Sequence, residues 1–367
     1  MKRKKVLIVS RSFYPIIAPR SFRASELAKE LSRQGHSVTI LTHKKKSFNY
    51  SEFSQKHELQ IKDFVFDKWI ALKTDNLLKK GIRLMMSYLF EFPDIQLAFY
   101  LNKQLKKESN YDLIISIAIP YSIHWGVALA KKNNPHLTKT WIADCGDPFT
   151  GDKERRFTPP FYFRYIEKWF CKQPDYITVP IEEAIEAYPF ICQKKIKVIP
   201  QGFSFEDVKF ANSTIKRDQI VFGYAGTFNK GKREPKLFLD YLSELDGLDF
   251  KFVVYTKATA IVEPYKKDLG NKLVIKDYVP RLQLLNELSN MNFLVNIENK
   301  YDVQKPSKLI DYALTGRPIL SVSSSKLNKK VIDEFLNGNF ENKVTIKNLD
   351  QYNIKNVVQK FLDLAKE

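Results

Sequence analysis

The stretch KPSKLIDYALTGRPIL, residues 305–320, decides the fold of the second half of the chain. It follows NFLVNI (292–297), an apolar run typical of a buried strand, and it opens with a proline and a serine suited to a first helical turn. Gly316 and Pro318 then end the helix before the next apolar strand. The pattern predicts a strand, a loop and a helix, the repeating unit of an α/β domain.

The start of this helix also predicts an anion site. Exposed N–H groups at a helix start attract negative charge, and Lys308 adds a cation beside Pro306 and Ser307. The expected guest is a phosphate or a diphosphate. The alternative is an ordinary capped helix without a ligand.

A glycine-rich turn follows an earlier strand of the same half, in GYAGTFNKGKREP (223–235). Gly226 lets the backbone approach a phosphate, and Lys230 and Arg233 supply positive charge. The two turns follow strands of one predicted sheet, so each supports the other as part of a single site.

The net charge of +19 lies mostly in the first half, where residues 1–200 hold 34 Lys and Arg against 20 Asp and Glu. Such a surface favours anionic partners: nucleic acid, acidic lipid headgroups or phosphorylated substrates. No DNA-binding or RNA-binding signature accompanies the charge, so a nucleic acid is not the expected partner.

The chain contains no apolar run of 18 residues, and its first apolar segment is too short for a signal peptide. We therefore expect a cytoplasmic protein. Its three cysteines, Cys145, Cys171 and Cys192, are odd in number and unevenly spaced, and we expect reduced thiols.

A length of 367 residues predicts two domains. KVLIVS (5–10), a helix from about Ser21 and HSVTILT (36–42) form a βαβ unit, although the first loop lacks the G-x-G-x-x-G pattern. We place a boundary after Phe203, giving domains at 1–203 and 204–345. Residues 346–367 are expected to contain a final helix that packs back on the first domain.

Polar side chains mark the expected ligand edge of the first sheet. Arg20, Ser21 and Arg23 lie at the first helix start, facing the carboxyl end of the first strand. The alternative is a solvated basic turn.

Another strand, in WIADCGDPF (141–149), ends in Asp144 and Asp147, and His124 follows a neighbouring strand. Carboxylates at this edge are placed to meet sugar hydroxyls, whereas the competing interpretation of Asp144 is a buried cap.

The segment 76–92 predicts a basic amphipathic helix, with Lys79, Lys80 and Arg83 beside an apolar stripe. A helix of this kind can lie on an anionic membrane surface. The alternative is a stripe that faces the core.

Five segments resemble motifs of the family 4 glycosyltransferases, in particular of the branch that builds bacterial surface polysaccharides. They are IPQGF (199–203), GYAGTF (223–228), PSKLIDYALTGRPIL (306–320), RQGHSVTILT (33–42) and WIADCGDPF (141–149). The resemblance implies the GT-B fold, in which two doubly wound, Rossmann-like α/β domains face each other across a cleft. The first domain is then the acceptor side, and the second binds the nucleotide sugar.

The sequence also departs from the family pattern. The family's two glutamates fall on Val303 and Asp311, and the arginine usual in the aspartate motif is Gly146. The glycine pair usual after the first strand is replaced by Pro19, Arg20 and Ser21.

The resemblance implies transfer of a sugar from a UDP-sugar or GDP-sugar to a hydroxyl, with retention at the anomeric carbon and without a metal or another cofactor. The acceptor is expected to be a glycan or lipid-linked oligosaccharide of capsule or lipopolysaccharide type. The expected donor residues are Gly226, Thr227, Lys230, Arg233, Pro306, Ser307, Lys308 and Asp311. The expected acceptor-side residues are Arg20, Ser21, Arg23 and Asp147. His124 and Asp144 are expected to be catalytic residues that position sugar or acceptor hydroxyls.

Lys308 and Arg233 are expected to stabilise the leaving diphosphate, and peripheral association with the anionic inner membrane surface is expected to bring the enzyme to its acceptor. Two alternatives remain open on the same fold: a nucleotide-sugar epimerase and a non-catalytic nucleotide-sugar-binding subunit. The charge leaves a third, a nucleic-acid binder.

Overall fold

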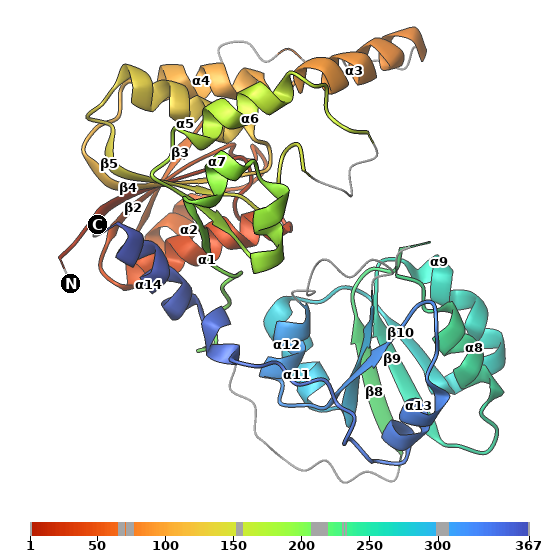
Figure 1. Cartoon of the computed structure of the whole chain (residues 1–367). Helices are drawn as coiled ribbons and strands as arrows, with labels where there is room; N and C mark the ends of the chain where they lie inside the picture. The colour runs from red at the N-terminus through yellow and green to blue at the C-terminus, as the bar shows by residue number, and fades with distance from the viewer. Residues whose placement is uncertain are drawn as a thin grey trace. The chain divides into compact units, whose positions relative to one another are not determined.

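The computed structural model describes residues 2–64, 70, 77–151, 157–206, 219–229, 231, 233–298 and 308–365. The chain forms two compact units, shown in Figure 1. The first unit comprises Met1–Phe203 together with Gln351–Glu367, and the second comprises Ser204–Asp350. The chain therefore leaves the first unit after the IPQGF turn and returns to it near its end.

The first unit is built on a parallel sheet of seven strands in the order β3-β2-β1-β4-β5-β6-β7. The strands are β1 Lys5–Ser10, β2 Ser37–Thr42, β3 Leu59–Asp63, β4 Tyr111–Ile117, β5 Thr138–Asp144, β6 Tyr176–Val179 and β7 Ile196–Val198. The strand order changes direction between β1 and β4, where Val6 pairs with Leu113. Ligands of doubly wound sheets bind at the carboxyl ends of strands beside such a point.

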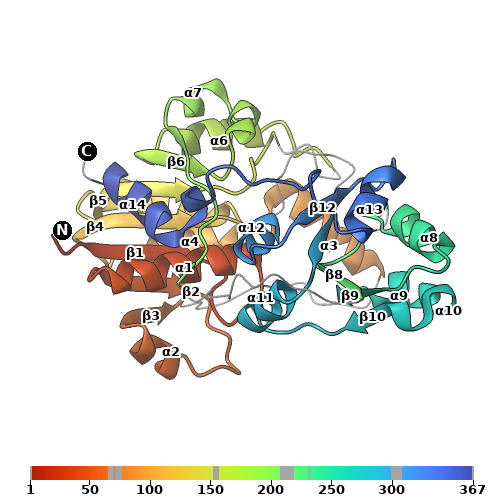
Figure 2. The same cartoon turned by 90° about the horizontal axis from the view of Figure 1, so that it is seen from below.

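Helices cover both faces of this sheet. They are α1 Pro19–Arg33, α2 Ser51–Lys56, α3 Leu77–Phe90, α4 Gln96–Leu105, α5 Ser122–Asn133, α6 Phe163–Cys171, α7 Phe190–Gln193 and α14 Ile354–Leu364. Figure 1 shows α4, α5 and α6 on one face and α1 with α14 on the other, and Figure 2 shows α1 and α14 side by side. Successive residues of β1 alternate between the two cores, as expected of a strand buried on both sides.

The final helix α14 belongs to the core of the first unit. Val357, Val358 and Phe361 are fully buried against α1 and the sheet. The Lys4 ammonium donates a hydrogen bond to the carbonyl of Ala365 at 3.2 Å, so the start of the first strand lies beside the end of the last helix. The first unit is thus made from two separate stretches of chain.

The second unit is a parallel sheet of five strands in the order β10-β9-β8-β11-β12. The strands are β8 Ile220–Ala225, β9 Phe250–Tyr255, β10 Leu273–Lys276, β11 Phe293–Ile297 and β12 Ile319–Val322. The helices are α8 Lys236–Glu244, α9 Thr259–Val262, α10 Lys266–Leu269, α11 Arg281–Ser289, α12 Lys308–Leu314 and α13 Lys329–Leu336. Here α8 and α13 cover one face, α11 and α12 the other, and the order changes direction between β8 and β11.

The expectation of three reduced thiols is wrong for two of the cysteines. Cys171 at the end of α6 and Cys192 in α7 form a disulfide, with their Cα atoms 5.1 Å apart. Cys145 alone is a thiol, and it is buried. The spacing of 21 residues along the chain could not reveal this pair, because the packing of α6 against α7 brings the two side chains together.

The amphipathic helix α3 does not face the core: none of its residues is buried. Leu77, Leu78 and Leu84 are 83, 74 and 67% exposed. Its end is tied to the segment before α6, because the Tyr88 hydroxyl donates to the Thr158 carbonyl at 3.1 Å. Among the described residues, no helix is both long and apolar enough to cross a membrane.

Candidate functional site

The carboxyl ends of β8 and β11 frame the donor residues expected in the second unit. Tyr312 of α12 joins that helix to β8, because its hydroxyl accepts from the Ala225 N–H at 2.7 Å and donates to the Ala225 carbonyl at 3.2 Å. Gly226 follows with φ +148°, a conformation that favours glycine. These contacts place the start of α12 beside the glycine-rich turn.

Lys308 opens α12, and its ammonium lies 4.4 Å from the centroid of the Tyr224 ring. The nitrogen is buried and has no hydrogen-bond partner in the described part of the chain. Burial holds the pKa of Lys308 well below its usual range, and the positive charge of Arg233 lowers it further. A cation over an aromatic ring is stabilised by the ring, but its three N–H donors remain unsatisfied.

Arg233 is positioned by the closed turn that follows β8. Its N–H donates to the Asn229 carbonyl at 2.8 Å, and the Asn229 N–H donates to the Arg233 carbonyl at 3.1 Å. Burial raises the pKa of Tyr224 to about 12, and Arg233 counteracts part of that rise. Two cations, Arg233 and Lys308, therefore share the surroundings of one tyrosine.

Asp311 lies one turn after Lys308 and is held by an arginine that sequence reasoning missed. Arg281, at the start of α11, donates to one Asp311 oxygen through Nε at 2.9 Å and through Nη2 at 2.6 Å. Burial raises the pKa of Asp311, whereas Arg281 lowers it. No sequence motif marks Arg281, because the pair depends on the packing of α11 against α12.

Of the other expected donor residues, the structure describes Thr227 but not Lys230, Pro306 or Ser307. Thr227 is exposed, and its carbonyl accepts from the Tyr224 hydroxyl at 3.3 Å. Lys230, Pro306 and Ser307 lie outside the described residues. The described donor candidates thus gather at one edge of the second sheet.

In the first unit, Asp144 at the end of β5 is 1% exposed and lies between two arginines. Arg23 donates to its two oxygens at 2.8 and 3.1 Å, and the Thr178 hydroxyl donates at 2.7 Å. Arg20 lies farther away, with Nη1 3.4 Å from Oδ2. Burial acts to raise the pKa of Asp144, but the arginines and Thr178 outweigh it and hold that pKa below its usual range.

Arg23 is a buried link between distant parts of the first unit. It is 2% exposed and donates to the carbonyls of Pro200 at 2.5 Å and Ile199 at 3.2 Å. Its guanidinium also lies 5.2 Å from the Phe361 ring of α14. Its neighbour Ser21 is buried as well, at 1% exposed, so Arg20 is the accessible one of the three predicted acceptor residues at the start of α1.

His124 lies in the core behind Asp144. It is fully buried, with Nδ1 2.7 Å from the Ser116 hydroxyl and Nε2 3.4 Å from the Cys145 sulfur. Burial lowers the pKa of His124 to about 3, so the imidazole is neutral at physiological pH. Asp147, three residues beyond Asp144, is half-buried, and its carbonyl accepts from the Tyr121 hydroxyl at 2.7 Å.

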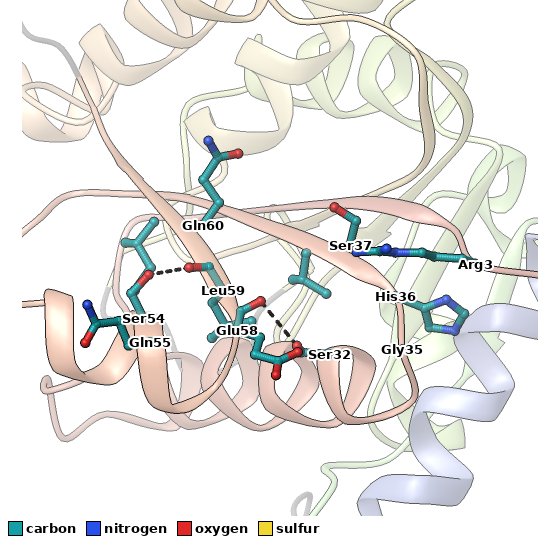
Figure 3. Close-up of a pocket in the computed structure, with 12 residues that line it drawn as sticks. Arg3, Ser32, Gly35, His36, Ser37, Ser54, Gln55, Glu58, Leu59 and Gln60 are labelled. Atoms are coloured by element: carbon teal, nitrogen blue, oxygen red, sulfur yellow. Dashed lines mark hydrogen bonds between the residues drawn. The ribbon is translucent and has the colours of Figure 1, made fainter.

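An open hollow of about 850 Å³ lies at the opposite edge of the first sheet, as Figure 3 shows. Its lining includes Ser37 at the start of β2 and Leu59 at the start of β3, with Ser32 donating to the Glu58 carbonyl at 3.3 Å. These are the amino ends of the strands. Because parallel sheets bind ligands at their carboxyl ends, we place neither donor nor acceptor in this hollow.

Comparison with known families identifies the family of this chain. The model of glycosyltransferase family 4 matches residues 22–207, just over half of the chain. The chain belongs to glycosyltransferase family 4. The resemblance inferred from the five sequence motifs is thereby confirmed. A search of curated proteins finds no match.

Solved structures show that this family 4 glycosyltransferase has the GT-B fold. A glycosyltransferase from Rickettsia africae matches with a TM-score of 0.67 and 12% identity, over 100% of this chain and 98% of that one. A mutant of S. aureus TarM, solved with fondaparinux, alpha-GlcNAc-glycerol and UDP, matches with a TM-score of 0.59 and 12% identity, covering 99 and 100%. WaaB, a lipopolysaccharide outer core galactosyltransferase, matches with a TM-score of 0.55 and 13% identity, over 99% of this chain and 97% of that one. At such identities the likeness establishes the fold alone, and it confirms the predicted α/β class.

Proposed function

We propose that this family 4 glycosyltransferase moves a sugar from UDP or GDP to a hydroxyl of a glycan or lipid-linked oligosaccharide, as in capsule or lipopolysaccharide synthesis. The anomeric configuration is retained, and no metal ion or other cofactor takes part. The observation that carries the proposal is the buried Lys308 ammonium, which has no hydrogen-bond partner among the described residues.

A buried cation with unsatisfied donors is costly unless an anion joins it. Lys308 lies over Tyr224 and shares its surroundings with Arg233, so a diphosphate bound there would accept hydrogen bonds from one cation and be neutralised by both. The same anion would raise the lowered pKa of Lys308 and keep the ammonium charged. The cost in the free protein is thereby offset when the donor binds.

This arrangement suits departure of a nucleoside diphosphate. As the bond from sugar to phosphate breaks, negative charge grows on the phosphate, and fixed cations lower the energy of that state. In our proposal Lys308 and Arg233 stabilise this charge, aided by Lys230, Ser307 and the backbone near Gly226, Thr227 and Pro306. Asp311, oriented by Arg281 at 2.6 Å, accepts hydrogen bonds from the ribose.

The residues of the first unit take two kinds of role in this proposal. Asp144 and His124 are buried and fully engaged with Arg23, Ser116 and Cys145, so they act by positioning the loop that follows β5. The more accessible Asp147 and Arg20 contact the acceptor.

Incubation of the purified chain with a panel of UDP-sugars and GDP-sugars tests the donor site. We expect donor turnover in the wild type, retention in the product's anomeric NMR coupling, and loss of turnover in Lys308→Met. Lys329→Met, which removes an exposed lysine of the same unit, is the matched control. Conversion of donor into an epimer without acceptor would favour an epimerase, and tight binding without turnover would favour a non-catalytic subunit.

We further propose that α3 brings the enzyme to the anionic cytoplasmic face of the membrane. The helix exposes Leu77, Leu78 and Leu84 together with Lys79, Lys80 and Arg83. Phe157 and Phe161, 65 and 73% exposed, extend this apolar surface, and Phe157 lies 6.3 Å from Tyr88 of α3. Apolar side chains beside cations match an acidic lipid surface.

Flotation with vesicles that contain phosphatidylglycerol tests this surface. We expect binding at low salt, reduced by changing Lys79, Lys80 and Arg83 to Gln and further reduced by Leu78→Ser with Leu84→Ser. The control changes three exposed lysines elsewhere in the first unit, Lys45, Lys46 and Lys106. Equal flotation of all variants, or none by the wild type, would remove the proposal.

A further inference from the structure

Arg20, in the first turn of α1, places a partly exposed guanidinium at the carboxyl edge of the first sheet. It lies where β5 ends at Asp144, close to the change in strand direction between β1 and β4. This edge is where a doubly wound sheet receives its ligand. The question is what chemistry Arg20 offers there.

The charges around Arg20 do not cancel. Asp144 carries one negative charge, and Arg23 neutralises it through a two-point ion pair at 2.8 and 3.1 Å. Arg23 also donates hydrogen bonds to the carbonyls of Ile199 and Pro200. Two guanidinium groups against one carboxylate leave one positive charge, and it resides on Arg20.

Arg20 also retains hydrogen-bonding capacity. Its one side-chain hydrogen bond among the described residues is the long one from Nη1 to Asp144 at 3.4 Å, so Nε and Nη2 make no hydrogen bond with the described residues. Its side chain is 22% exposed. A guanidinium with adjacent N–H groups that make no other hydrogen bond can donate two parallel hydrogen bonds to an oxyanion.

Gly146 fixes the position of this guanidinium. A Cβ atom added at Gly146 would lie 1.3 Å from Nη2 of Arg20 and 2.3 Å from its Cζ. The side chain of Arg20 therefore occupies the space that any other residue at 146 would fill. Arg20 is preorganised by Asp144 on one side and by the bare backbone of Gly146 on another, which lowers the entropic cost of binding.

We infer that Arg20 binds an oxyanion, a phosphate or a carboxylate, and that this group belongs to the acceptor. Only the second part rests on the function proposed above. The specificity of this site for an anion comes from the positive charge of Arg20 and from its N–H donors, which are held in position before the ligand binds.

Calorimetric titration of the full chain tests the site. The protein is first saturated with UDP to fill the second unit, and inorganic phosphate or acetate is then added in separate runs, which distinguishes phosphate from carboxylate binding. Arg20→Gln should lower the affinity for the preferred anion by about tenfold or more, as expected for the loss of charge-assisted hydrogen bonds. Arg11→Gln removes an arginine of the same unit that pairs with Asp94, and it should bind the anion as the wild type does.

The space shared by Arg20 and Gly146 provides a second measurement that does not need a ligand. Gly146→Ala should displace Arg20, weaken anion binding as Arg20→Gln does, and lower the thermal midpoint by about 3–8 °C through overpacking. In an Arg20→Gly background the same alanine should cost almost nothing, because the space is then empty. If Arg20→Gln fails to fold, Arg20→Lys replaces it, keeping the charge while losing the paired donors.

Either of two outcomes overturns the inference: unchanged phosphate and acetate binding in the Arg20 variants, or equal effects of Gly146→Ala with and without Arg20. Failure of the proposed function looks different. If UDP does not bind or no sugar is transferred, anion binding that depends on Arg20 can still be measured in Lys308→Met, and the site then stands without its link to an acceptor.

Discussion

Lys308 illustrates how a residue that lowers the stability of the free protein can serve the function that we propose. Its ammonium is buried without a hydrogen-bond partner among the described residues, so the folded protein disfavours the charged form. A pKa below the usual value means that the unfolded chain binds more protons than the folded one. Stability in the free protein therefore rises with pH, from the lowered folded pKa up to the ordinary lysine value of about 10.4.

Lys308→Met should raise the unfolding free energy of the free protein by about 1–3 kcal/mol at neutral pH, because it removes a buried unsatisfied group of similar length. The gain should shrink as the pH approaches the lysine pKa. The same variant should lose the thermal stabilisation that UDP gives the wild type. Denaturant melts from pH 6 to 10 with and without UDP measure both effects, and a destabilised variant would contradict the account.

Lys308→Arg tests the proton balance at the same position. Because a diphosphate should raise the pKa of Lys308, wild-type binding should take up protons and weaken as the pH rises. An arginine stays charged throughout, so its binding should take up none at this position. Calorimetry of UDP binding in buffers of different ionisation enthalpy measures the uptake, and equal values for both proteins would refute the linkage.

At the scale of elements, the Arg23–Asp144 pair joins α1, β5 and α14 around the residues that lead out of the first unit. Arg23 reaches Asp144 and the carbonyl of Pro200, and it lies against Phe361. Buried ion pairs are costly to break because the remaining charge loses its partner. This cluster makes the position of Arg20 depend on elements far apart in sequence.

Asp144→Asn should lower the unfolding free energy by about 3–5 kcal/mol at pH 7, since Arg23 is left buried without a counter-ion. The wild-type contribution is present above the ordinary Asp pKa of about 3.9 and is lost as the pH falls through the lower folded pKa. The two proteins should therefore converge in acid. Urea melts between pH 3 and 7 measure this, and a constant difference would contradict the assignment.

At the scale of the whole molecule, the first unit is completed by Gln351–Glu367, a stretch that follows the second unit in the sequence. Its helix α14 buries Val357, Val358 and Phe361 in the same core as α1. The stability of the first unit thus depends on the last residues of the chain, whereas the five-stranded unit contains its own two cores.

Phe361→Ala should cost about 3–5 kcal/mol, the usual range for a large side chain removed from a packed core. We expect the loss in Met1–Phe203 and Gln351–Glu367, with Ser204–Asp350 unaffected. Hydrogen exchange followed by mass spectrometry resolves the two units. Lys355→Ala, an exposed change on the same helix, serves as the control, and uniform loss of protection would contradict two separately stabilised units.

The sequence alone determined the alternation of strands and helices, the α/β class and the family resemblance, and it predicted Lys308 as a donor residue. These follow from apolar runs, turn residues and short motifs, which act within a few residues of each other. The sequence also predicted correctly that Asp144 ends a strand, but it could not distinguish a ligand contact from the buried ion pair with Arg23.

Only the tertiary structure decided which side chains meet. Three contacts join residues that are far apart in the sequence. Arg281 and Asp311 are separated by 30 residues, Cys171 and Cys192 by 21, and Arg20 and Gly146 by more than 100. Such contacts arise because packing brings distant elements together, and no local pattern records them. The same holds for the Lys308 ammonium, because its burial without a hydrogen-bond partner among the residues that the structure describes depends on the packing around it.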